Sequence, residues 1–144
     1  MQKIITFALM LFISTTAVMA DPTDKMVHDA QNKFQNELSR CGVFYEILAG
    51  CLSDEDAQKN KITTLSKKTI QQAIKLGLKV DIKIDKILAG LRQERASLIS
   101  VIEGECANYS VIVEQHYANC TNVSKMAEKL VKNWDPKHRG SAAE

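Results

Sequence analysis

The stretch RCGVFYEILAGC, residues 40–51, places Cys41 and Cys51 ten positions apart in a segment whose apolar residues recur at helical spacing. Ten residues of α-helix rise about 15 Å, whereas a disulfide requires Cα atoms within about 7 Å of each other. The two cysteines therefore cannot bond to each other within one helix. Their partners must be Cys106 and Cys120, so the pairing depends on which helices are neighbours.

The first twenty residues are typical of a cleavable secretory signal. A basic Lys3 precedes an apolar run over residues 4–13, and the small residues Val18 and Ala20 come just before Asp21. The run is shorter than the roughly 20 residues that span a bilayer, and no charge cluster follows to stop transfer. We therefore expect the mature chain to begin at Asp21, to be secreted or periplasmic, and to contain no membrane span. The alternative is an uncleaved membrane anchor.

Length and charge indicate one small domain after the signal peptide of residues 1–20. Helical patterns cover residues 21–136, and residues 137–144 are predicted to be a disordered tail. Loss of Lys3 leaves 18 basic and 17 acidic side chains, a net charge of +1. This balance does not indicate a nucleic-acid partner.

Four cysteines in an exported chain predict two disulfides. Their spacings of ten and fourteen residues lack the short C-x2-C or C-x4-C pairs of zinc sites, so no metal is expected. Haem is not expected either. In the register that the cysteines indicate, Met26, a possible partner for His116, faces about residue 135, roughly 28 Å along the last helix from His116. No C-x-x-C-H motif is present either.

Apolar residues at three-four spacing predict four helices, which gives an all-α, antiparallel four-helix bundle. The first helix should end near Gly50, and the acidic SDED at 53–56 should cap the second, which Gly77 interrupts. The third should start near Val80 and end at Gly104. The fourth should run from Tyr109 to Trp134, closed by Pro136.

Two features leave alternatives open. The segment LGLKVDIKID, residues 76–85, alternates apolar and polar residues as a half-buried strand would, although it has no partner strand. If Gly104 does not break the chain, the last two helices merge into a three-helix arrangement with a long C-terminal helix.

The register of the helices decides the disulfide pairing. Contacting residues on antiparallel helices have a nearly constant sum of numbers. The pair Cys51 and Cys106 gives 157, and the pair Cys41 and Cys120 gives 161. The difference is about one helical turn. If the last helix instead runs parallel to the first, Cys41 with Cys106 and Cys51 with Cys120 fit equally well.

Lysines recur every seven residues along the second helix, on the side opposite its apolar stripe. The candidate partner-binding residues are Lys61, Lys68, Lys75 and Lys79, and Lys83 and Lys86 extend the basic region. Such a face could contact an acidic protein or an anionic surface, although many lysine faces serve only solubility.

Two further sets of polar residues are candidates. Asn108, Asn119 and Asn122 open N-x-S/T triplets on one side of the last helix, and they are glycan acceptors if the chain comes from a eukaryote. His116 lies on an apolar face, level with Tyr45 by the register. It is more simply explained as a core histidine than as a general base, because no nucleophile accompanies it.

The sequence therefore predicts an exported, disulfide-stapled helical interaction protein without catalytic activity, such as an inhibitor, an immunity-type protein or a host-facing factor. One alternative is a carrier of a small apolar ligand in the bundle core, where Gly42, Ala49 and Gly50 could leave space. The other is an enzyme that uses His116.

Overall fold

A computed structural model describes residues 22–134, and the predicted signal peptide, the Asp21 start, Pro136 and the C-terminal tail lie outside this range. The described chain is all α, as predicted. Its elements are α1 (Pro22–Cys51), α2 (Lys59–Lys79), α3 (Ile84–Val101), a short 3-10 helix η1 (Cys106–Asn108) and α4 (Tyr109–Trp134). None of these helices is both long and apolar enough to span a bilayer.

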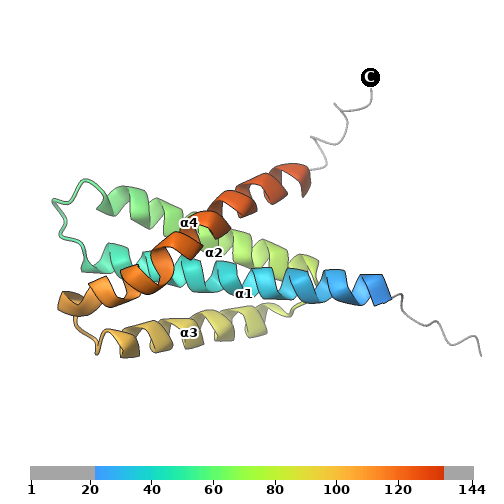
Figure 1. Ribbon diagram of the computed structural model, residues 1–144, viewed down its shortest axis with the longest axis horizontal. Helices are drawn as coiled ribbons and strands as arrows, with labels where there is room; N and C mark the ends of the chain where they lie inside the picture. The colour runs from blue at the N-terminus through green and yellow to red at the C-terminus, as the bar shows by residue number, and fades with distance from the viewer. Residues whose placement is uncertain (1–21, 135–144) are drawn as a thin grey trace, which may run out of the picture.

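Helix α1 is the centre of the bundle, and the three other helices pack against it (Figure 1). Successive helices run in opposite directions, so α2 and α4 are antiparallel to α1. The four-helix prediction is confirmed. Helix α4 crosses α1 obliquely, and its C-terminal end projects away from the bundle.

The chain between α3 and α4 forms a sharp turn, which excludes one long C-terminal helix. Glu103 and Gly104 have φ angles of 55° and 73°, in the left-handed region that ends helices. The amide of Gly104 donates to the carbonyl of Ile99 at 2.9 Å. The predicted break at Gly104 is therefore present.

The predicted cap of the second helix is wrong. Helix α2 begins at Lys59, and the SDED acids lie in the preceding turns. The Asp56 carboxylate accepts a hydrogen bond from the amide of Gln58 at 2.7 Å, and Lys59 Nζ pairs with Asp54 at 2.5 Å. These acids stabilise a turn, which competes with helix capping for the same side chains.

The alternating segment 76–85 forms neither a strand nor the start of a helix at Val80. It contains the end of α2, a connection in which Asp81 has a φ of 61°, and the start of α3 at Ile84. The amide of Ile82 donates to the carbonyl of Gly77 at 2.9 Å. This turn buries Val80 and half-buries Ile82, whereas Leu78 and Ile84, two other apolar residues of the alternation, are exposed.

The core is built around α1. Its largest fully buried side chains include Leu38 and Phe44 of α1, Leu76 of α2 and Ile112 of α4. Helices α1 and α2 lie close together at Gly42, whose carbonyl accepts a hydrogen bond from Ser66 Oγ at 2.9 Å. A Cβ at Gly42 would lie 2.5 Å from Ile70 Cγ1, so Ile70 occupies the space that a side chain would need.

Candidate functional site

Two disulfides fix α4 and the short helix η1 that precedes it to α1. Cys41 bonds to Cys120, and Cys51 bonds to Cys106, each with a Cα–Cα distance of 5.1 Å. These are the pairs of the antiparallel register. Both half-cystines of the first bridge are fully buried, whereas Cys106 is exposed at the end of the bundle. The first half of α4 is therefore covalently held, and its second half is not.

His116 lies between the two bridges on α4. Its ring centroid is 6.0 Å from that of Phe44, and Phe44 rather than Tyr45 is its aromatic neighbour. Burial lowers the pKa of His116, the positive charge of Arg40 lowers it further, and Glu94 and Glu37 act in the opposite direction. The surroundings thus favour a neutral imidazole. Among residues 22–134, no three His, Cys, Asp or Glu side chains gather into a group that could hold a metal ion.

The lowered pKa of His116 predicts a pH-dependent stability. In the unfolded chain, His116 takes up a proton as the pH falls through the ordinary pKa of 6.5, whereas in the folded chain it does so only at a lower pH. The free energy of unfolding should therefore decrease as the pH falls from the unfolded to the folded pKa of His116. Below the folded pKa, both states are protonated and the loss should level off. Urea titrations at several pH values should show a smaller pH dependence for His116→Gln than for the parent. Equal dependence in both would contradict this prediction.

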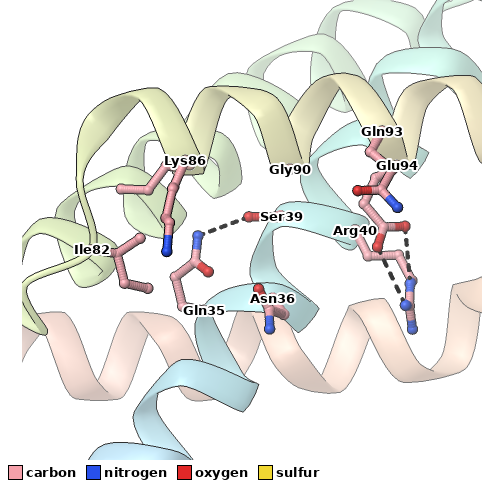
Figure 2. A pocket seen from close by; sticks show the side chains of 10 residues that line it. Gln35, Asn36, Ser39, Arg40, Ile82, Lys86, Gly90, Gln93 and Glu94 are labelled. Atoms are coloured by element: carbon pink, nitrogen blue, oxygen red, sulfur yellow. Dashed lines mark hydrogen bonds and ion pairs between the residues drawn. The ribbon is translucent and has the colours of Figure 1, made fainter.

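A polar cavity of about 400 Å³ lies between α1 and α3 (Figure 2). The buried Gln35 donates from Nε2 to Ser39 Oγ at 3.0 Å. Arg40 forms two hydrogen bonds with Glu94, at 3.2 Å and 3.4 Å, and the bond to Glu94 raises the pKa of Arg40. These four side chains satisfy one another, whereas Asn36, Lys86 and Gln93 line the same cavity without a side-chain hydrogen bond to another described residue.

The predicted lysine residues of α2 are all exposed, but their surroundings differ. Lys68 Nζ pairs with Glu128 of α4 at 2.5 Å, and Lys61 lines a groove between α2 and α4. Lys75 and Lys79 lie further along α2. Lys83 and Lys86 belong to the α2–α3 connection and the start of α3, so they extend a different surface. We keep the name lysine face for Lys61, Lys68, Lys75 and Lys79.

The three sequon asparagines have different surroundings. Asn108 lies in η1 rather than on α4, is half-buried, and donates to the carbonyl of Ile102 at 3.2 Å. Asn119 donates to Glu37 at 3.0 Å, and Asn122 is exposed. The prediction that all three share one side of a single helix is therefore wrong for Asn108.

The α2–α4 groove was not predicted from the sequence. It measures about 500 Å³ and is lined by residues of α1, of α2 with its preceding turn, and of α4: Tyr45, Leu48, Gln58, Lys61, Ile62, Leu65, Tyr117, Thr121, Ser124, Lys125 and Glu128. A sequence signal for this groove is present on α4. Its groove-lining residues recur at helical spacing from Tyr117 to Glu128, beside the residues of α4 that face the core. The space predicted at Gly42 is filled by Ile70. Ala49 and Gly50 line a surface pocket of about 360 Å³ between α1 and α2.

Comparisons with known proteins give no relative for this chain: no protein-family model, no curated protein and no solved structure matches it.

Proposed function

We propose that this protein is an exported binding protein without catalytic activity, such as an inhibitor, an immunity-type protein or a host-facing factor. It presents the lysine face of α2 to an acidic protein partner. The observation that carries the proposal is the exposure of all four lysines of this face on one helix. The disulfides support export, because such bonds persist in oxidising compartments.

The scaffold behind this face is suited to binding with little rearrangement. Helix α2 packs closely on α1 at Gly42, and α1 is linked to α4 by two disulfides. A rigid surface loses little conformational entropy on association. Lys61 and Lys75 form no ion pair with any residue of the described range, whereas Lys68 is paired with Glu128. The exposed charges would act mainly by steering an acidic partner toward the surface.

The test is a charge reversal of Lys61, Lys75 and Lys79 to Glu, compared with a control that reverses Lys25, Lys33 and Lys129. All six lysines are exposed, so helicity by circular dichroism should stay unchanged in both variants. Affinity chromatography against the fluid that surrounds the source cells should retain one partner on the parent and on the control. The face variant should lose at least about 90% of this partner at low salt.

Two results would count against the proposal. The first is a partner that the face variant retains as well as the parent does. The second is a partner whose binding is insensitive to salt, because interactions between exposed charges are screened beyond about 10 Å at 0.1 M ionic strength.

A further inference from the structure

We infer that the α2–α4 groove binds a small amphiphilic monoanion, a medium-chain fatty-acid carboxylate. This inference goes beyond the proposed function, because the ligand and most of the groove residues differ from the lysine face. Its starting point is the path of α4. The bridge at Cys120 holds α4 against α1, and further along α4 Glu128 pairs with Lys68 of α2. Between these two helices a groove is open above the α1 surface.

The floor and one wall of the groove are apolar. Tyr45 and Leu48 of α1 form the floor, at 2% and 7% exposure, and Ile62 and Leu65 of α2 continue it. Tyr117 of α4 is 55% exposed at the edge. The volume of about 500 Å³ lies within the range of roughly 300–1,000 Å³ that is usual for small-molecule sites. Tyr45 and Leu48 are already shielded from water, so an alkyl chain in the groove would remove apolar surface from water mainly at Ile62, Leu65 and Tyr117.

The rim of the groove is positively charged. Lys61 and Lys125 line opposite walls, both are exposed, and neither forms an ion pair within residues 22–134. Glu128, the acid at the same rim, is paired with Lys68. The groove therefore presents uncompensated positive charge beside an apolar floor, which is complementary to a carboxylate on an alkyl chain.

A buried hydroxyl gives an independent indication of a polar ligand group. Ser124 lines the groove at 8% exposure, and its Oγ has no hydrogen-bond partner among the described residues. An unsatisfied buried polar atom is costly and uncommon. Because its Oγ is closed off from solvent, the hydroxyl would have to rotate toward the groove, where it could donate to a carboxylate held by Lys125, one residue away.

The test uses octanoate, which remains monomeric at millimolar concentration, and the mature chain with both disulfides intact. In a ¹H–¹⁵N NMR titration, we expect saturable shifts at Leu65, Tyr117 and Thr121. Lys125→Glu should weaken octanoate binding about tenfold, which corresponds to the loss of one charge-assisted hydrogen bond. The matched control is Lys129→Glu, an exposed lysine one turn further along α4 that does not line the groove, and it should bind as the parent does.

Neutral octanol separates the charge from the alkyl chain, and it should bind about tenfold more weakly than octanoate. The inference is overturned if octanoate gives no saturable shifts at the groove, if Lys125→Glu and Lys129→Glu bind equally, or if octanol matches octanoate. Lys75→Glu with Lys79→Glu alters the lysine face but not the groove. This double variant should keep octanoate binding even if the proposed acidic partner does not exist.

Discussion

Replacement of both Cys41 and Cys120 by alanine is expected to lower the free energy of unfolding by about 5 kcal/mol. The two residues are 79 apart in sequence, but because the Cys51–Cys106 bridge persists, their bond closes a loop through residues 41–51 and 106–120 only, which accounts for about 3.5 kcal/mol in the chain-entropy model. Both side chains are fully buried, so the lost sulfur atoms also leave a cavity, which adds about 1 kcal/mol or more. Because small domains are stable by only about 5–15 kcal/mol, this variant should be close to unfolding.

The second bridge provides the control for this prediction. Cys51 and Cys106 are 55 apart, but because the Cys41–Cys120 bridge persists, their bond closes the same loop and accounts for nearly the same entropy, about 3.5 kcal/mol. Cys106 is exposed and Cys51 half-buried, and replacement of this pair by serine should leave no core cavity. Urea denaturation followed by circular dichroism should rank the buried-bridge variant as less stable. The opposite ranking would show that the packing around Cys41 and Cys120 contributes less to the free energy of unfolding than the Cys51–Cys106 bond, which holds the α3–α4 turn.

The disulfide pairing could be predicted because it depends on few variables. Helical periodicity places Cys41 and Cys51 on one side of α1, and a covalent bond tolerates only a narrow Cα separation. Once the chain turns at Gly104, only one pairing keeps both bridges in register. That turn was itself predictable, because glycine is the residue that most readily adopts a left-handed conformation.

The α2–α4 groove could not be predicted, because it depends on a crossing angle. Periodicity indicates which side of a helix is buried, but not the angle at which two buried sides meet. The sequence showed Lys61 and Lys68 as solvent-facing, which is correct. Only the oblique path of α4 brings Lys125 and Glu128 alongside them. The start of α2 was mispredicted for a different reason. The carboxylate of Asp56 can either cap a helix or stabilise a turn, and here it accepts the amide of Gln58 and stabilises the turn.

Substitution of Gly42 by leucine is expected to lower the free energy of unfolding by about 3 kcal/mol or more. A Cβ at this position would lie 2.5 Å from Ile70 Cγ1 and 3.1 Å from the backbone nitrogen of Ile70. The side chain of Ile70 could rotate, but the backbone of α2 cannot move away without lengthening the buried bond from Ser66 Oγ to the Gly42 carbonyl. Overpacking and a weakened hydrogen bond therefore act together.

The matched control lies eight residues further along the same helix. Gly50 is exposed within α1 and has no heavy atom within 4 Å of the position of an added Cβ. Gly50→Ala should therefore stabilise the protein by up to about 1 kcal/mol, because alanine is the better helix former. Gly42→Ala gains the same propensity but meets Ile70, so it should be less stable than Gly50→Ala when both are measured by urea denaturation. If the two alanine variants prove equally stable, the close approach of α1 and α2 at Gly42 is looser than this structure places it, and α2 is not held rigidly behind its lysines.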